Sequence, residues 1–211
     1  MKEKAIIFST AMVKAILEGS KTMTRRTQGL EEINKNSNDW ICKRSLEDGS
    51  YWFQHPQKKN EYLYNYYPKP RYQVGDMLWV KETWYIQPEL WEMNHNPQPI
   101  HYKADGNIQC LEDYILKPSI FMPKWASRIT LEVVSVKAER LQDISEEDAI
   151  AEGTPIHDFF GIGTARLAGL TTVDYFAELW DSLDKKYPWA SNPWCFVYSF
   201  KRHNPQRAIE I

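Results

Sequence analysis

The sequence predicts an α+β fold in which a mixed, partly closed β-barrel is flanked by helices. Three observations lead to this prediction. A strand and a helix open the chain, mostly strands follow with two later helices, and strand and helix do not alternate regularly. Regular alternation is typical of a doubly wound parallel sheet, so the sequence argues against that class.

The N-terminal part of the chain carries clear local signals. Ala5 to Phe8 is an apolar run with the length of a short buried strand. Ser9 or Thr10 can cap the following helix, whose apolar residues recur on one face, and Gly19 is placed to end it. Residues 22–27 alternate enough to form a strand that leaves this helix.

The later core elements follow from the same periodicities. Residues 128–137 have a regular strand pattern, and Ser145 is a good N-cap for a helix that Gly153 ends. Further strands are expected at residues 77–84, 100–103 and 194–201, and a further helix at 172–183. Periodicity is lost at residues 28–70 and 85–116, so we predict one domain, residues 1–211, with insertions at these two places.

The net charge and the aromatic content limit the kinds of ligand that the protein can be expected to bind. The formal net charge is −2 and the sequence pI is about 6.2, so any binding of nucleic acid must be local. Aromatic residues make up 14% of the chain, with nine Trp and twelve Tyr, which is more than a core of this size needs. These rings either pack the long loops or line a pocket for a flat ligand such as a nucleobase.

No metal, cofactor or membrane partner is expected. The three cysteines are an odd number without metal-ligand spacing, which argues against a disulfide framework and a zinc site and favours a reducing compartment. The five histidines are scattered, at His55, His95, His101, His157 and His203. Because the N-terminal apolar run is too short for a signal peptide and no stretch could span a bilayer, we expect a cytoplasmic protein.

The segment from Gly19 to Arg26 concentrates three cations and three hydroxyls just past the end of the first helix. These groups can simply complement the helix dipole and satisfy loose backbone groups. Alternatively, Lys21 and Thr24, three residues apart in a tight turn, can place a lysine beside a hydroxyl nucleophile or an oxyanion.

Glu152 breaks a local rule. It is predicted at the C-terminal end of the helix that begins after Ser145, where the helix dipole disfavours an anion. Such placement raises the pKa of a carboxyl group, which suits a general acid or base, although a surface glutamate in water feels little of this effect. Departures from local rules tend to mark functional sites.

Five segments in order resemble the ASCH family of PUA-like domains, in particular the longer form met in bacteriophages and prophages. The segments are GSKTMTRR at 19–26, VGDMLWVKETW at 74–84, SRITLEV at 127–133, LQDISEEDAIAEG at 141–153 and NPWCFVYSFKR at 192–202. The resemblance touches both ends of the chain and leaves 28–70 and 85–116 as insertions. It implies a PUA-like β-barrel with a cleft for a nucleoside or RNA.

A small bacterial member of this family is an amidohydrolase that removes the acetyl group of N(4)-acetylcytidine with a lysine, a threonine and a glutamate. By resemblance, these residues correspond to Lys21, Thr24 and Glu152. Thr24 would attack or position water, Lys21 would accept a proton or stabilise negative charge, and Glu152 would shuttle the proton. This chain is much longer and carries Arg25 where the small enzyme has an aliphatic residue, so its substrate is left open.

Candidates for holding a base are Arg25, Arg26, Trp79, Glu82, Trp84 and Arg128. Trp79 and Trp84 lie on a predicted strand and can equally pack in the core, and Arg128 and Glu82 can equally form an ion pair with each other. Three alternatives to an amidohydrolase remain: a module that binds RNA or a modified base without chemistry, a ribonuclease, and a phage accessory protein that binds another protein through its insertions. The oligomeric state is left open.

Overall fold

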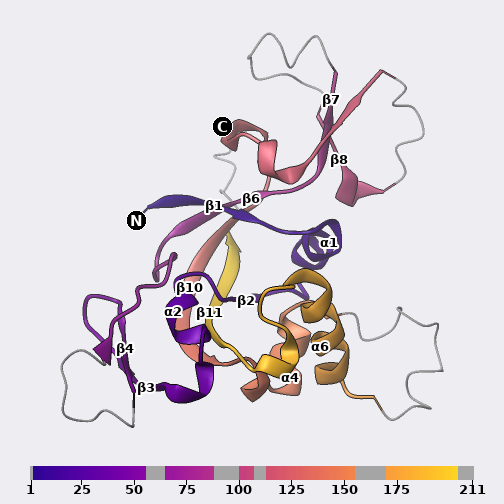
Figure 1. Ribbon diagram of the computed structural model, residues 1–211. Helices are drawn as coiled ribbons and strands as arrows, with labels where there is room; N and C mark the ends of the chain where they lie inside the picture. Colours follow the sequence, from indigo (N-terminus) through magenta and orange to yellow (C-terminus); the bar gives the residue numbers. More distant parts are fainter. Residues whose placement is uncertain (1, 56–64, 88–99, 107–112, 155–169, 204–211) are drawn as a thin grey trace. The chain divides into compact units, whose positions relative to one another are not determined.

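The computed structural model describes residues 2–55, 65–87, 100–106, 113–154 and 170–203 (Figure 1). The chain divides into two compact units, which we describe separately. Unit 1 comprises residues 1–19, 75–133 and 200–211, and unit 2 comprises residues 20–74 and 134–199. The predicted mixed α+β class is confirmed, and no closed barrel is detected among the described strands. The partly closed barrel and the single domain with insertions stay predictions.

The first sheet of unit 1 combines a strand from residues 1–19 with strands from residues 75–133. Strand β1 (Glu3–Ile7) pairs in parallel with β6 (Met77–Lys81), and β6 pairs antiparallel with the first residues of β10 (Thr130–Arg140). Helix α1 (Thr10–Glu18) follows β1 and begins as predicted, because the Ser9 hydroxyl accepts a hydrogen bond from the Met12 amide. Gly19 ends the helix in the left-handed conformation, with φ of 85°.

The second sheet of unit 1 occupies one predicted insertion. Strands β7 (Trp84–Ile86), β8 (His101–Tyr102) and β9 (Ile115–Lys117) pair in the order β8-β7-β9. Short 3-10 turns follow at η4 (Lys103–Asp105), η5 (Ser119–Phe121) and η6 (Lys124–Ala126). The single strand predicted at residues 77–84 is therefore wrong, because β6 ends at Lys81 and β7 begins a new sheet at Trp84.

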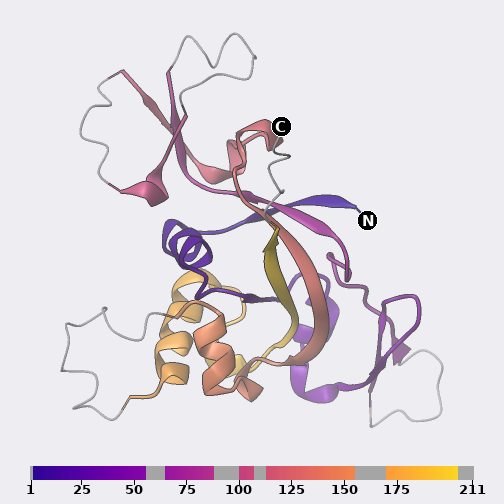
Figure 2. The same cartoon turned by 180° about the vertical axis from the view of Figure 1, so that it is seen from behind.

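The core of unit 2 lies where two helices meet the strands. Strand β2 (Met23–Arg26) pairs antiparallel with β11 (Trp194–His203), whose neighbour is β10. Helices α4 (Glu146–Ala151) and α6 (Thr172–Leu183) lie side by side next to β2 in both views (Figures 1 and 2). Their apolar faces bury one cluster, made of Leu141, Ile144, Ala149, Phe176, Trp180 and Cys195.

The other predicted insertion of unit 2 also contains regular structure. It holds α2 (Glu31–Asn34), η1 (Ser37–Asp39) and a sheet of β3 (Ile41–Ser45), β4 (Tyr51–Gln54) and β5 (Asn65–Tyr66). The sequence showed only an insertion without periodicity here, and the structure adds these short elements to it. Two further 3-10 turns, η7 (Leu141–Asp143) and η8 (Trp189–Ser191), flank the helices.

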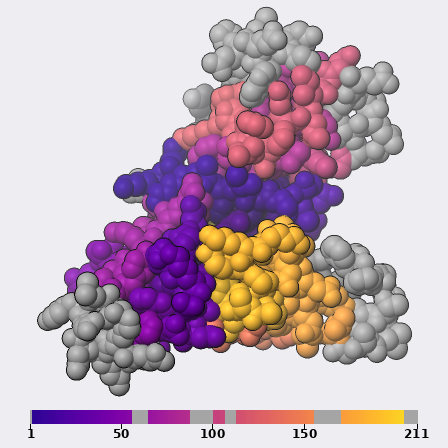
Figure 3. All heavy atoms as spheres, in the orientation of Figure 1, coloured from indigo at the N-terminus to yellow at the C-terminus, as the bar shows by residue number. Residues whose placement is uncertain are grey.

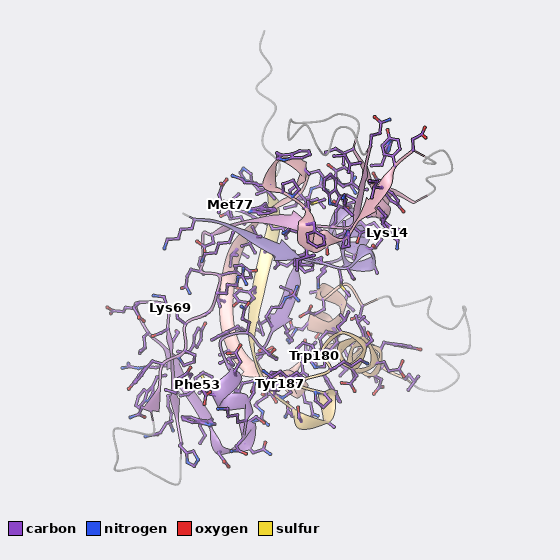
Figure 4. All side chains as sticks on the ribbon, turned by 45° about the horizontal axis from the view of Figure 1, so that its top comes forward. Lys14, Phe53, Lys69, Met77, Trp180 and Tyr187 are labelled. Atoms are coloured by element: carbon purple, nitrogen blue, oxygen red, sulfur yellow. The ribbon has the colours of Figure 1, made fainter. Side chains whose placement is uncertain are left out.

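Many aromatic residues of the chain pack against one another. The ring of Phe53 meets Trp194 edge-on at 5.0 Å, and Tyr72 meets Tyr198 in the same way at 5.2 Å. The indole of Trp180 donates a hydrogen bond of 2.8 Å to the Tyr187 carbonyl, and both residues are labelled in Figure 4. Packing thus explains a large part of the aromatic content.

No helix in the described ranges is long and apolar enough to cross a bilayer.

We predict that Thr171→Ala destabilises the protein by about 1 kcal/mol. The Thr171 hydroxyl accepts from the Asp174 amide, and alanine removes this half of the capping box. The other half, in which the Asp174 carboxylate accepts from the Thr171 amide at 2.7 Å, uses only the backbone of residue 171. The midpoint of urea unfolding measures the change. Thr171→Ser keeps the hydroxyl and serves as control, and equal losses in both variants would contradict the capping role.

Candidate functional site

The backbone brings Lys21 and Glu152 together. Helix α4 ends at Ala151, Glu152 is its C-cap residue, and Gly153 turns the chain away with φ of 77°. Lys21 and Glu152 then form an isolated antiparallel bridge, and the Thr22 amide donates to the Ala151 carbonyl at 2.8 Å. The predicted position of Glu152 at the helix end is confirmed.

The side chains of Lys21 and Glu152 form a buried ion pair. The Lys21 Nζ donates to Glu152 Oε2 at 2.9 Å and to the Glu152 backbone carbonyl at 2.6 Å. The exposed fractions of the two side chains are 2% and 5%. Because removing charges from water is costly, a pair this deeply buried requires further hydrogen bonds to the carboxylate.

Arg25 supplies these further hydrogen bonds. Its Nη1 donates to Glu152 Oε1 at 3.2 Å, while Nη2 donates to Glu139 Oε1 at 2.5 Å and to Asp148 Oδ2 at 2.7 Å. The guanidinium carbon lies 6.0 Å from the ring centre of Phe176, on α6. Arg25, predicted as a substrate-binding neighbour, thus sits in the ion network and joins β2, β10, α4 and α6.

Lys137 completes the charge balance of this network. Its Nζ lies 2.8 Å from Glu139 Oε2 and 3.3 Å from Asp148 Oδ2. The network, which we define as Lys21, Arg25, Lys137, Glu139, Asp148 and Glu152, therefore holds three cations and three carboxylates. Equal numbers of opposite charges reduce the cost of burying its inner members.

The network perturbs the protonation of its two innermost cations in opposite directions. Burial lowers the pKa of Lys21, and the charge and hydrogen bond of Glu152 oppose this effect without cancelling it. Burial also acts against the charged form of Arg25, but Glu152, Asp148 and Glu139 outweigh it and raise the pKa of Arg25. Arg25 therefore stays a cation, whereas Lys21 is the cation that gives up its proton more readily than usual.

Thr24 lies on β2 but faces a different direction from Arg25. In the pairing of β2 with β11, Thr24 is opposite Tyr198 and Arg25 is opposite Val197. Successive side chains of a strand point to opposite faces, so Thr24 shares its face with Arg26 and Tyr198, while Arg25 faces Glu152. The structure thus brings Lys21 and Glu152 into contact and places the buried Thr24 on the opposite face of β2 from Arg25.

Glu82 and Arg128, two more predicted site residues, form an ion pair in unit 1 in which the carboxylate is buried and the Arg128 side chain is 25% exposed. Arg128 donates to both carboxylate oxygens of Glu82, at 2.9 and 3.0 Å, and to Asp105 at 2.9 Å. Its guanidinium carbon lies 3.9 Å from the ring centre of Tyr102. Burial raises the pKa of Glu82, and Arg128 opposes this effect in part. Of the two roles that the sequence allowed for Glu82 and Arg128, an ion pair or the holding of a base, these contacts are those of an ion pair.

The two predicted tryptophans of unit 1 differ in exposure. Trp84 is fully buried with Ile86 and Met122, so its ring is part of the core. Trp79 lies on the half-exposed face of β6, and the Nζ of Lys81 lies 5.5 Å from the centre of its ring.

Sequence reasoning missed several residues around Glu152. Glu139 and Asp148 belong to the ion network, and no local pattern singled them out. Thr154, two residues after Glu152, is buried, and its hydroxyl has no hydrogen-bond partner among the described residues. The same holds for Nε of Arg25. Such buried polar atoms require a partner, for example a water or a ligand group.

No cluster of His, Cys, Asp or Glu that could hold a metal ion is present in the described part of the chain. His55, His101 and His203 belong to that part, whereas His95 and His157 lie outside the described residues.

Comparison with known proteins yields one similar structure. No family model matches the chain, and no curated protein matches it. Among solved structures, the chain is similar to the crystal structure of an ASCH domain from Lactobacillus crispatus JV V101. The TM-score is 0.36 and the identity is 14%, over 95% of this chain and 79% of that one. Because this TM-score is low, we draw no conclusion about fold or chemistry from the similarity.

We predict that Arg25→Met lowers the free energy of unfolding by about 3–5 kcal/mol, because it leaves three carboxylates without their shared buried cation. Lys35→Met removes an exposed pair with Glu32 and should cost less than about 1 kcal/mol. Chemical denaturation at neutral pH measures both changes. Similar losses in the two variants would contradict a central role of Arg25.

The ion network also predicts a dependence of stability on pH through Asp148. Burial by itself raises the pKa of Asp148, but the hydrogen bond and charge of Arg25 outweigh it, so this pKa lies below its usual value of 3.8. The stabilisation is therefore present above pH 3.8 and is lost as the pH falls through the folded-state pKa. The stability gap between the wild type and Asp148→Asn should shrink in this acidic range. Glu147→Gln, at an exposed neighbouring position, is the control, and a constant gap for Asp148→Asn would contradict the prediction.

Proposed function

We propose that Lys21 and Glu152 are the acid–base pair of a hydrolase that cleaves an amide on a nucleobase, such as the acetyl amide of an acylated cytidine. One observation carries this proposal: the Lys21 Nζ is buried and donates a hydrogen bond to the Glu152 carboxylate, and burial lowers the pKa of Lys21. A lowered pKa raises the fraction of lysine present as the neutral amine, which is the form that can accept a proton.

Amide cleavage sets three requirements. A nucleophile must add to the carbonyl carbon, the resulting oxyanion must be stabilised, and the departing nitrogen must receive a proton. In the proposed reaction, the neutral Lys21 amine takes a proton from the attacking water, whose oxygen adds to the carbonyl carbon. The ammonium that results stabilises the oxyanion and then returns the proton to the leaving nitrogen.

Glu152 has a positioning and electrostatic part in this proposal. Its Oε2 holds the Lys21 Nζ, and its Oε1 is held in turn by Arg25. A carboxylate next to the amine favours the ammonium form as that form develops in the transition state. Glu152 can also relay the proton between Lys21 and the leaving nitrogen.

Thr24 has a positioning part in this proposal, because its hydroxyl faces away from Lys21 and Glu152. Its side chain lies on the β2 face shared with Tyr198 and Arg26. On this face the hydroxyl can approach a substrate that contacts Arg26. The Thr24 hydroxyl is proposed to hold the substrate or the attacking water, and its variants test this role.

We predict that Lys21→Ala and Glu152→Gln each reduce kcat for N(4)-acetylcytidine about 10²–10⁴-fold. Thr24→Val should also lower kcat, because it removes the positioning hydroxyl, whereas Thr24→Ser should retain most activity. Lys14→Ala, at an exposed site on α1 labelled in Figure 4, is the matched control with unchanged kcat. Circular dichroism must show that each variant is folded.

The pH profile gives an independent readout. Because the neutral amine is the active form, kcat/KM of the wild type should rise with pH through the lowered pKa of Lys21 and then level off. Glu152→Gln removes an interaction that raises this pKa, so the rise should move to lower pH in that variant. Absence of turnover by the wild type on every acylated nucleoside tested would overturn the proposal.

A module that binds RNA or a modified base without chemistry is the second candidate. It is favoured by one observation, that both carboxylate oxygens of Glu152 already accept hydrogen bonds from cations of the chain. Such a module would bind RNA equally well in the wild type and in Glu152→Gln and would show no turnover.

A further inference from the structure

Unit 1 exposes large apolar side chains on two short turns. Ile120 and Phe121, on η5, are each 61% exposed, and Trp125, on η6, is 38% exposed. Figure 3 shows part of this region, the pink atoms, at the molecular surface. Single exposed apolar residues need no explanation, whereas several on consecutive turns mark an interaction site.

The two turns hold these side chains rigidly. Each turn follows a proline, and the Phe121 amide donates to the Pro118 carbonyl at 3.0 Å, as the Ala126 amide does to the Pro123 carbonyl at 3.1 Å. Met122 and Ala126 are each only 1% exposed and anchor the turns in the core. Phe121 and Trp125, each directly before one of these anchors, are therefore presented to solvent by an ordered backbone.

Lysines accompany the exposed rings. The Lys81 Nζ, on β6, donates to the Ile120 carbonyl, which places this ammonium at η5. Lys124 lies on η6 next to Trp125, and its ion pair with Glu3 joins two side chains that are each more than half exposed. An ion pair in water contributes little, so a phosphate can replace Glu3 at low cost. Residues 114–128 contain no Asp or Glu.

The combination of rings and lysines selects one kind of partner. Stacking on aromatic rings together with contacts from cations to phosphates is how single-stranded nucleic acids are bound without reading their sequence. Protein–protein interfaces are, by contrast, depleted in lysine. The net charge of −2 requires that any binding of nucleic acid be local, and the segment 114–128 contributes lysines but no carboxylate of its own.

We propose that the patch of Lys81, Ile120, Phe121, Lys124 and Trp125 binds single-stranded nucleic acid. Bases stack on Phe121 and Trp125, and the ammonium groups of Lys81 and Lys124 contact the phosphates. Arg128 takes no part, because Glu82 and Asp105 already hold its guanidinium. The patch shares no residue with the Lys21–Glu152 pair, so this inference goes beyond the proposed reaction and does not depend on it.

Fluorescence anisotropy with a labelled oligouridylate of about 12 nucleotides tests the proposal, a length within the range that such surfaces cover. Phe121→Ala should weaken binding roughly 5- to 150-fold, the loss of one stacked base. Trp125→Ala should act similarly, and Trp125→Phe, which keeps a ring, should retain most of the affinity. Lys124→Gln should reduce the slope of log affinity against log salt by about one.

Matched controls come from exposed positions of unit 2. Leu183, on α6, has the same 61% exposure as Phe121, and Lys35 is an exposed lysine in an ion pair, as Lys124 is. Leu183→Ala and Lys35→Gln should bind the oligonucleotide like the wild type. Oligothymidylate should bind with comparable affinity if stacking dominates, whereas a blunt RNA duplex should bind much more weakly.

Three results would overturn the proposal: no binding by the wild type, unchanged affinity in both Phe121→Ala and Lys124→Gln, or a wild-type dimer in sedimentation that Phe121→Ala dissociates. The last result would identify the patch as a protein interface. Turnover of a free acylated nucleoside should be the same in Phe121→Ala and wild type, so failure of the nucleic-acid surface and failure of the proposed hydrolase are measured separately.

Discussion

Unit 2 depends on the pairing of charges around one buried carboxylate, that of Glu152. It accepts hydrogen bonds from Lys21 and Arg25, and Arg25 in turn holds Glu139 and Asp148. An incomplete network would leave a charge in a low-dielectric interior at a cost of several kcal/mol. The strands β2 and β10 and the end of α4 must therefore meet where they do for these charges to be paired.

The burial that requires these paired charges also changes the protonation of Lys21. Removing the ammonium from water lowers its pKa, whereas Arg25, held by three carboxylates, keeps its charge. One site thus contains a permanent cation that organises the carboxylates and a second cation that can release its proton. A division of this kind, in which neighbouring groups are pushed to different protonation behaviour, is common in sites that transfer protons.

In unit 1, some polar and aromatic side chains are used in contacts within the fold, whereas others are exposed to solvent. The guanidinium of Arg128 is held by Glu82 and Asp105 and lies over Tyr102, so its donors are used within the fold. Trp84 is likewise buried. Phe121 and Trp125 instead remain exposed beside lysines, because their neighbours Met122 and Ala126 anchor the turns. The aromatic content therefore has two causes, packing within the fold and a surface that presents rings to solvent.

Local sequence patterns predicted the α+β class, a cap of α1 at Ser9 or Thr10, the cap of α4 at Ser145, and the position of Glu152 at a helix end. These depend on residues within a few positions of one another, which is the range of capping and periodicity. Long-range contacts, by contrast, place Arg25 in the network, turn Thr24 away from it, and form small sheets in both predicted insertions. Partners of a buried charge, the face of a short strand and the pairing of two-residue strands all depend on segments far apart in the chain, and no local pattern encodes them.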